Sequence, residues 1–396
     1  MNPNLQKLHA LGQSLWLDNI TREMLGDGTM ARYIAEYSVT GLTSNPTIFE
    51  HAIGTGDFYD AQIAELSRKG KAGEELFFEL AISDLARAAD LFRPIHDATQ
   101  GVDGWVSLEV SPVIVNDAAR TTEAAARLSA AAARPNVYIK IPGTPAGVEA
   151  IEASIFAGVP INVTLLFSCE QYLAAVGAYL RGIERRIAAG LDPKVESVAS
   201  LFVSRWDVAV KDEVPPQYRN RLGIAISKRT YKAYRELLAS PRWLRLAAAG
   251  AHPQRLLWAS TGTKDPAARD TLYVEALAAP DTVDTIPDKT LKAFADHGKV
   301  GAVLAGDGGD AETVLAEFRK LGIDDAALAV RLQQEGADSF QRSWDSLLAG
   351  IEGKRAKIGG SHGQVNSPRD ALTAGNASVR VASPPRSSQT ASKKDH

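Results

Sequence analysis

Lys140 lies where a charged side chain is costly to place. The segment 137–142 (Val-Tyr-Ile-Lys-Ile-Pro) is short and apolar, and its alternation puts aliphatic residues on one face and Tyr138 and Lys140 on the other. The sequence Pro-Gly-Thr-Pro at 142–145 ends the segment just after the lysine. A lysine that burial keeps unprotonated can attack a carbonyl carbon, so this segment predicts Schiff-base chemistry.

Two carboxylates occupy comparable places in other apolar segments. Asp18 lies late in the run 15–20, and Glu109 lies late in the run 105–110. Carboxylates beside an amine can transfer protons while an imine forms and breaks. Lys140, Asp18 and Glu109 therefore form a chemically coherent candidate set.

Strand-like apolar runs alternate with alanine-rich helical stretches through most of the chain. We expect eight strands, at 15–20, 40–45, 105–110, 137–141, 161–167, 198–203, 256–261 and 282–286. This alternation predicts an α/β protein with a parallel sheet, and eight units over this length favour a (β/α)8 TIM barrel with helical insertions. The sequence has no Gly-rich nucleotide-binding loop.

In such a barrel the polar residues of the strands become informative, because helices cover one face of each strand and the barrel interior covers the other. Asn162 and Thr164 alternate with aliphatic residues in the run 161–167. Ser200 does the same in the run 198–203. We therefore expect polar groups to converge on the interior. Asp18, Glu109 and Lys140 should meet at the carboxyl-terminal mouth.

The chain divides into a catalytic domain at 1–351 and a tail at 352–396. Helical inserts are expected at 72–97 and 228–246, and a helix at 337–348 carries Phe340, Trp344 and Leu347 on one face. The tail is rich in small and polar residues, with eight Lys and Arg against three Asp and Glu. This composition predicts a disordered basic segment that can be removed after Gly350 without loss of fold or activity.

Composition excludes several classes of protein. Cys169 is the only cysteine, so neither an internal disulfide nor a cysteine-based metal cluster is expected, and the scattered histidines predict no metal site. The formal charge of −3 gives no reason to expect nucleic acid. Neither a membrane span nor a signal peptide is apparent, which predicts a cytoplasmic protein. A homodimer is common for cytoplasmic enzymes of this size, and the sequence leaves the oligomeric state open.

Each candidate also has an ordinary structural interpretation. Lys140 could point into water from an edge strand, and Glu109 could be a solvated strand-end acid. Asp18 could cap the next helix, and Asn45 before Pro46 could belong to a turn that opens a helix. Arg205 could be a surface salt-bridge partner. It is the joint occurrence of these residues that favours a functional site.

Five segments together resemble transaldolase. They are Leu-Trp-Leu-Asp-Asn-Ile at 15–20, Gly-Leu-Thr-Ser-Asn-Pro-Thr-Ile at 41–48, Val-Ser-Leu-Glu-Val at 106–110, Ile-Lys-Ile-Pro-Gly-Thr at 139–144 and Ile-Asn-Val-Thr-Leu-Leu-Phe at 161–167. The resemblance covers residues 5 to 350 in order.

The resemblance implies a metal-free enzyme without a cofactor that works on sugar phosphates in the pentose phosphate pathway. Such an enzyme transfers a dihydroxyacetone unit from sedoheptulose 7-phosphate or fructose 6-phosphate to an aldose phosphate. Lys140 matches the Schiff-base lysine, and Asp18 matches the acid/base at the donor C4 hydroxyl. Glu109 and Thr164 match the pair that orders a catalytic water.

The resemblance also implies a substrate-binding set. Asn45 and Asn162 match amides that hold the donor hydroxyls, and Thr43 supports them. Ser200 and Arg205 fall on the phosphate-binding positions after the sixth strand. Many transaldolases carry an arginine at the end of strand seven, where this chain reads Ala-Ser-Thr-Gly-Thr-Lys at 259–264. Lys264 is the substitute we expect there.

Two other functions compete with transfer. A fructose 6-phosphate aldolase resembles transaldolase in fold and lysine but releases free dihydroxyacetone. Such enzymes tend to carry glutamine in place of Glu109 and are much shorter, so both features favour transfer. The second alternative is a catalytically silent barrel that serves as a binding protein. The presence of Asp18, Glu109 and Lys140 argues against this alternative, because an inactive relative usually lacks a charged catalytic residue.

Overall fold

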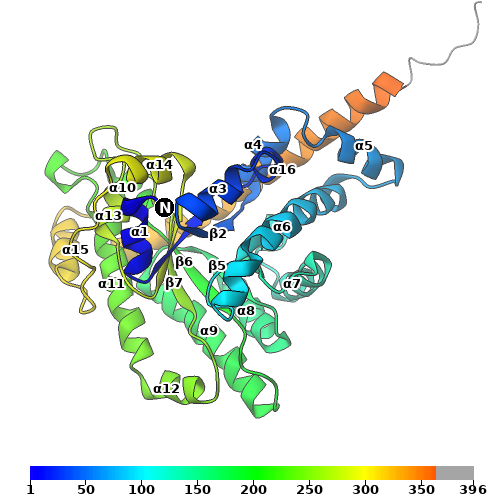
Figure 1. Cartoon of the computed structure of the whole chain (residues 1–396). Helices are drawn as coiled ribbons and strands as arrows, with labels where there is room; N and C mark the ends of the chain where they lie inside the picture. Colours follow the sequence, from blue (N-terminus) through cyan, green and yellow to red (C-terminus); the bar gives the residue numbers. More distant parts are fainter. Residues whose placement is uncertain (363–396) are drawn as a thin grey trace, which may run out of the picture.

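The computed structural model describes residues 1–362 and the side chains of residues 1–358. Eight parallel strands form a closed barrel in the order of the sequence, surrounded by helices (Figure 1), so the predicted (β/α)8 TIM barrel is confirmed. The strands are β1 Gln13–Leu17, β2 Val39–Thr43, β3 Val106–Glu109, β4 Val137–Pro142, β5 Ile161–Leu166, β6 Ser197–Phe202, β7 Arg255–Ala259 and β8 Thr282–Ile286. Each predicted run overlaps one of them.

The helices include the expected crossovers and several insertions. They are α1 Pro3–Ala10, α2 Arg22–Gly26, α3 Thr29–Glu36, α4 Pro46–Gly54, α5 Asp60–Arg68, α6 Gly73–Ala98, α7 Ala118–Ala132, α8 Pro145–Ala157, α9 Cys169–Ala188, α10 Ser204–Val210, α11 Leu222–Leu238, α12 Pro241–Ala248, α13 Leu272–Ala276, α14 Asp288–His297, α15 Ala311–Lys320 and α16 Asp325–His362. The insert predicted at 72–97 corresponds to α6. The helix predicted at 228–246 is instead two helices, because Ser240 caps a new helix that begins at Pro241.

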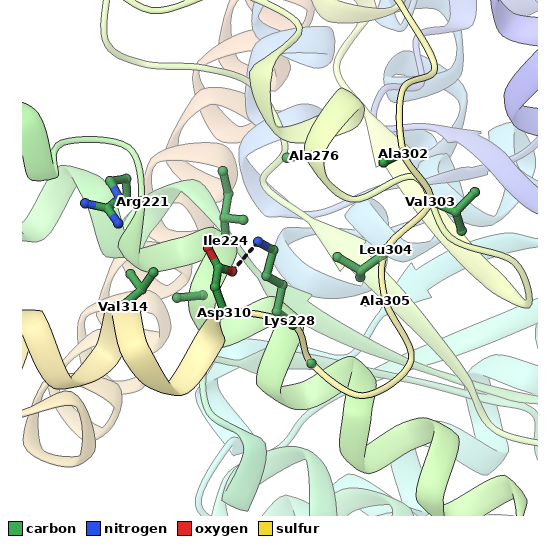
Figure 2. Close-up of a pocket in the computed structure, with 13 residues that line it drawn as sticks. Arg221, Ile224, Lys228, Ala276, Ala302, Val303, Leu304, Ala305, Asp310 and Val314 are labelled. Atoms are coloured by element: carbon green, nitrogen blue, oxygen red, sulfur yellow. Dashed lines mark hydrogen bonds and ion pairs between the residues drawn. The ribbon is translucent and has the colours of Figure 1, made fainter.

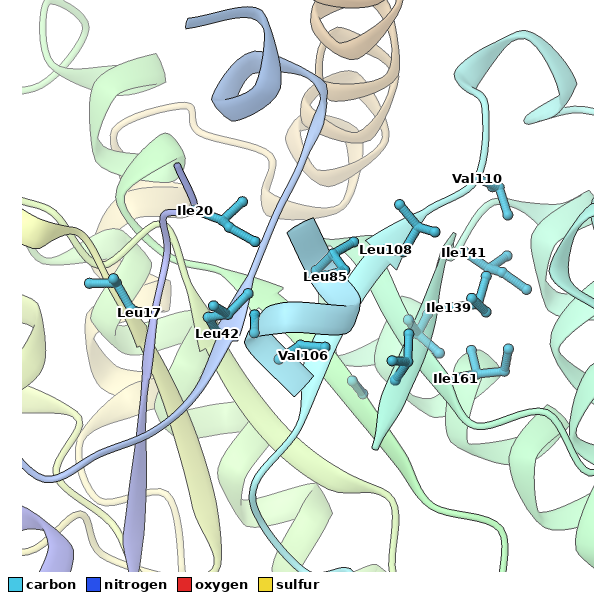
Figure 3. Close-up of a cluster of buried hydrophobic side chains, with 14 of the residues drawn as sticks. Leu17, Ile20, Leu42, Leu85, Val106, Leu108, Val110, Ile139, Ile141 and Ile161 are labelled. Atoms are coloured by element: carbon cyan, nitrogen blue, oxygen red, sulfur yellow. The ribbon is translucent and has the colours of Figure 1, made fainter. Parts of the chain in front are cut away.

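Alternation along the strands separates two cores. The outer faces of the strands carry aliphatic side chains that pack under the helices, among them Leu108, Ile139 and Ile161 (Figure 3). The inner faces carry larger groups, and Trp16, Tyr138 and Leu257 belong to a second cluster inside the barrel. The predicted faces of the strands are therefore correct.

Aromatic side chains fill the barrel beneath Lys140. The rings of Trp105 and Tyr138 stack with centroids 4.1 Å apart, and Trp16 lies 6.0 Å from Tyr138. Gly41 makes room for this packing, since a Cβ there would lie 2.6 Å from the carbonyl oxygen of Trp105 and 2.8 Å from the Trp16 ring. Trp16 Nε1 donates to Asp103 at 2.7 Å, which satisfies the indole. The barrel is thus solid below the lysine and open only above it.

Helix α16 continues past the predicted domain boundary. The prediction of disorder from residue 352 is wrong for 352–362, which are helical, and the rest of the predicted tail, 363–396, lies outside the residues that the structure describes. Ile351 is fully buried, and Lys354 donates to Asp60 at 2.7 Å and to the carbonyl oxygen of Gly56 at 2.6 Å. Contacts with the α4–α5 region therefore stabilise a helix that its own composition does not favour.

None of the helices within residues 1–362 has an apolar stretch long enough to cross a bilayer.

We predict that truncation after Gly350 destabilises the protein, contrary to the expectation from composition. Ile351→Ala removes a fully buried side chain and should lower the free energy of unfolding by about 2 to 5 kcal/mol. Denaturant unfolding would measure this loss. Val330→Ala in the same helix is the control, because Val330 is 67% exposed and should change stability little. Equal stability of the Ile351→Ala and Val330→Ala variants would contradict the docking of this end of α16.

Candidate active site

A cavity of about 130 Å³ opens at the carboxyl ends of the strands. Its wall includes most of the residues singled out in the sequence, namely Asp18, Thr43, Asn45, Lys140, Thr164, Ser200, Arg205 and Lys264. Glu109 and Asn162 lie directly behind this wall, in contact with Lys140 and Ser200 respectively. The barrel therefore brings all the predicted site residues together, as expected for the catalytic face of this architecture.

Lys140 is buried, with only 5% of the residue exposed. Its strand lies between β3 and β5 in the closed barrel, so the edge-strand interpretation is wrong. The amine donates to the carbonyl oxygen of Ser44 at 3.1 Å and lies 3.4 Å from Glu109 Oε2. Parallel register explains the second contact, because Glu109 and Lys140 are paired residues of β3 and β4.

Burial changes the pKa of both carboxyl groups, Glu109 and Asp18. Desolvation raises the pKa of Glu109, which is 6% exposed, and the charge of Lys140 opposes this rise. Desolvation also raises the pKa of Asp18, against the charge of Lys140 and a 2.9 Å hydrogen bond from Thr43 Oγ1. Asp18 does not cap the following helix, whose cap is Thr21. Both carboxyls hold a proton more readily than exposed ones, which suits groups that exchange protons.

Two buried oxygens of the site lack a hydrogen-bond partner among the residues that the structure describes. They are Glu109 Oε2 and Thr164 Oγ1. Glu109 Oε2 has the amine of Lys140 at 3.4 Å as an ionic neighbour, but both oxygens keep hydrogen-bonding capacity beside the cavity, where buried polar atoms are normally satisfied. The backbone is irregular at the same place, since Leu165 adopts a left-handed φ of 56° just after Thr164.

A hydrogen-bonded chain orders the amide of Asn162. Asn162 Nδ2 donates to Ser107 Oγ at 3.1 Å, and Asn162 Oδ1 accepts from Ser200 Oγ at 2.7 Å. Ser200 therefore supports an amide of the site. Asn45 caps α4 by accepting from the backbone N–H of Ile48 at 3.0 Å, so the helix-opening interpretation is correct and leaves its NH2 group for the cavity.

Two cations of the cavity wall remain without an ionic partner. Among residues 1–358, Arg205 has only the longer-range charges of Glu335 and Glu109 near it, and Lys264 that of Asp18, without a hydrogen bond or a close ion pair. Arg205 is half-buried, its guanidinium lies 5.1 Å from the Phe202 ring centroid, and burial lowers its pKa from the usual value. The surface salt-bridge interpretation of Arg205 is wrong. A partly desolvated, unpaired guanidinium is suited to bind an anion.

Helix α16 covers part of the mouth, which the sequence did not reveal. Gln333 donates to the carbonyl oxygens of Gly143 and Leu165, at 3.0 and 2.9 Å. Gly336 faces Arg205, since a Cβ there would lie 3.2 Å from Arg205 Nη1. Phe340 completes the cavity wall. The apolar stripe containing Phe340 predicted a packed helix, but only the structure shows that it packs over the site.

A larger cavity of about 430 Å³ lies between α11 and the segment 302–310 (Figure 2). Its wall is mainly aliphatic. Its charged side chains are already paired, Lys228 with Asp310 at 2.6 Å and Arg221 with Glu317 at 3.2 Å. It therefore lacks the free polar groups that distinguish the cavity at the barrel mouth.

Comparison with known proteins agrees with this geometry. The family described as "Transaldolase/Fructose-6-phosphate aldolase" matches residues 15–351. A protein named transaldolase from Parafrankia sp. (strain EAN1pec) is 44% identical over 357 residues, which cover 88% of this chain and 97% of that protein. One from Thiobacillus denitrificans is 45% identical over 349 residues, covering 86% and 97%, and one from Neisseria gonorrhoeae is 42% identical over 346 residues, covering 87% and 98%.

The match extends over the barrel, the residues around the cavity at its mouth and most of α16, and the relatives are matched over nearly their whole length. The chain belongs to the transaldolase/fructose-6-phosphate aldolase family.

Proposed function

We propose that the protein is a transaldolase that transfers a dihydroxyacetone unit between sugar phosphates through a Schiff base on Lys140. The observation that carries this proposal is the buried amine of Lys140, 3.4 Å from Glu109 and in the same cavity as Asp18. The donor would be sedoheptulose 7-phosphate or fructose 6-phosphate, and the acceptor erythrose 4-phosphate or glyceraldehyde 3-phosphate. We infer that the reaction belongs to the non-oxidative pentose phosphate pathway in the cytoplasm.

In the first half of the proposed reaction, the Lys140 amine adds to the ketose carbonyl at C2 and forms a carbinolamine. Loss of water gives a protonated imine. Asp18 then takes the proton of the C4 hydroxyl as the C3–C4 bond breaks, and the bonding electrons pass into the imine to leave an enamine. The raised pKa of Asp18 favours this proton transfer, because the carboxylate becomes a stronger base.

In the second half, the aldose phosphate product leaves and the acceptor enters. The enamine carbon attacks the acceptor aldehyde, and Asp18 returns its proton to the new alkoxide. Hydrolysis of the new imine then frees the ketose phosphate and the Lys140 amine. Every proton taken in the first half is given back, so no external oxidant or reductant is required.

Formation and hydrolysis of the imine need a water molecule that can give and take protons. Glu109 Oε2 and Thr164 Oγ1 are both buried and accept no hydrogen bond from residues 1–358, which supports a water bound by these two groups. Glu109 also lies beside the Lys140 amine. We therefore assign the proton relay to Glu109, with Thr164 as the group that orients the water.

The phosphate of the donor needs positive charge at the rim of the site. Arg205 and Lys264 line the cavity and have no close ion pair within the described side chains, which supports a phosphate bound between them. The Ser200 hydroxyl already donates to Asn162. We therefore place Ser200, with Asn162, Asn45 and Thr43, around the donor hydroxyls instead of the phosphate.

Sugar phosphates are thus the proposed small-molecule partners, and a homodimer stays a prediction. A fructose 6-phosphate aldolase would use the same lysine but release dihydroxyacetone to water. Helix α16 covers part of the mouth and so limits the access of water to the enamine, which supports transfer.

Trapping of the imine tests the proposal directly. Borohydride reduction with fructose 6-phosphate should add a dihydroxyacetone-derived mass to the peptide that contains Lys140, and Lys140→Ala should abolish both labelling and activity. Mass mapping of the digested protein measures the site. Labelling of another lysine, with activity retained in Lys140→Ala, would remove the basis of the assignment. Free dihydroxyacetone formed without an acceptor would instead favour the aldolase.

Glu109→Gln should slow imine formation and hydrolysis by about 100-fold, because the amide cannot relay a proton. Binding of the donor should change much less. Single-turnover kinetics would separate the two effects. An unchanged turnover number would show that Glu109 is not the relay.

Arg205→Ala should weaken binding of phosphorylated donors by about 2 to 3 kcal/mol, the value typical of a hydrogen bond to a charged group. Binding of unphosphorylated fructose should hardly change. Arg181→Ala is a suitable control, because this arginine is on the surface and pairs with Glu152. Equal losses for both donors in Arg205→Ala would indicate a purely structural arginine.

A further inference from the structure

Lys264 lies on a loop that needs external support. The segment 260–271 connects β7 to α13 and contains no helix or strand. Lys264 is exposed at this loop, and its side chain lines both the active-site cavity and a second cavity of about 210 Å³. A cavity lies beside the loop, and hydrogen bonds hold the loop in place.

The first of these bonds lies at the inner end of the loop. Ser260 and Ser204 share a hydrogen bond between their hydroxyls at 2.9 Å, and the backbone N–H of Ser204 donates to the carbonyl oxygen of Ser260 at 3.1 Å. Ser204 is the first residue of α10, next to Arg205. The base of the loop is therefore joined to the helix that carries the other free cation.

The second bond lies at the outer end of the loop and centres on Asp207, two residues after Arg205. Asp207 is 5% exposed and accepts from the backbone N–H groups of Leu222 and Gly223, at 2.9 and 3.3 Å, at the start of α11. It also accepts from the hydroxyl of Tyr273 at 2.8 Å. Tyr273 belongs to α13, so this buried carboxylate joins α10, α11 and the far end of the loop.

The third bond holds the middle of the loop. Asn220, just before α11, donates to Asp265 at 2.7 Å. Its φ of 61° is left-handed, a conformation that asparagine tolerates better than most residues. Asp265 directly follows Lys264. Asn220 therefore fixes the backbone beside the cation.

We propose that Asp207, Tyr273 and Asn220 are positioning residues that hold Lys264 at the mouth opposite Arg205, so that both cations bind one phosphate group. This inference rests on the proposed function, because it presupposes a phosphorylated donor at this cavity. None of the three residues needs to touch the substrate. They act by fixing the loop, and therefore affect binding of the phosphate more than the chemistry at Lys140.

Tyr273→Phe and Asn220→Gly test the proposal, since each removes one hydrogen bond and leaves the backbone conformation accessible. Each should raise KM for fructose 6-phosphate and the inhibition constant of inorganic phosphate by about five- to tenfold, with kcat changed less than about twofold. Tyr234→Phe is the matched control. Tyr234 is also fully buried, but its hydroxyl donates at 2.8 Å to the carbonyl oxygen of Asp281, outside this loop.

A double-mutant cycle separates positioning from a general loss of structure. In a Lys264→Ala background, Tyr273→Phe should add almost no further rise in KM, because the cation that it positions is already gone. Additive losses, or no effect of either variant on phosphate inhibition, would overturn the proposal.

The same series distinguishes failure of the inference from failure of the function. Borohydride trapping at Lys140 with unphosphorylated dihydroxyacetone should remain in every variant. If the unmodified protein forms no imine, the proposed function fails. If it forms the imine and phosphate inhibits it equally in all variants, only the positioning role fails.

Discussion

The structure depends on the burial of one amine in a barrel that has no edge. Because the sheet closes on itself, β4 has a neighbour on each side, and Lys140 cannot turn toward water. A buried amine needs polar partners, which are the Ser44 carbonyl oxygen and Glu109, and the parallel register places Glu109 on β3 and Asn162 on β5 level with the lysine. The aromatic packing of Trp105 and Tyr138 closes the space below. The position of the lysine thus determines which residues can share its cavity.

Much of this arrangement follows from alternation within short strands. Residues of one parity face the interior, so polar residues at the carboxyl ends must converge, and the eight strands and the convergence of the candidate residues on one cavity could be predicted from the sequence. The ends of the helices were harder to predict from the sequence. The end of α16 has few apolar residues, and its stability depends on Asp60, which lies 294 residues earlier in the chain. Local composition carries no information about such a partner.

The side of the mouth that carries Arg205 and Lys264 shows a second limit of prediction from the sequence. Arg205 and Lys264 could be proposed from their places after β6 and β7, but not the bonds that fix them. Asp207 looks like an ordinary helical acid, and its role emerges only when α11 and α13 are brought beside it. Likewise, the reason for a glycine at position 336 is seen only in the structure, where a Cβ would crowd the guanidinium of Arg205. Residues that line the cavity could be inferred from type and spacing, whereas the residues that hold them in place become apparent only from their neighbours in the structure.

Because α16 is the last helix of the described chain, it also determines when the mouth of the barrel is covered during synthesis from the N-terminus. Thr47 and Ser343, 296 residues apart, share a 2.8 Å hydrogen bond, and Gln333 joins the ends of β4 and β5. The barrel can close only after β8 has left the ribosome, and its mouth is covered only after α16 follows. Contacts of such long range slow folding, because loop closure must precede them. A nascent chain that already contains Lys140 and every strand of the barrel would therefore hold its lysine beneath an open mouth until α16 has been made.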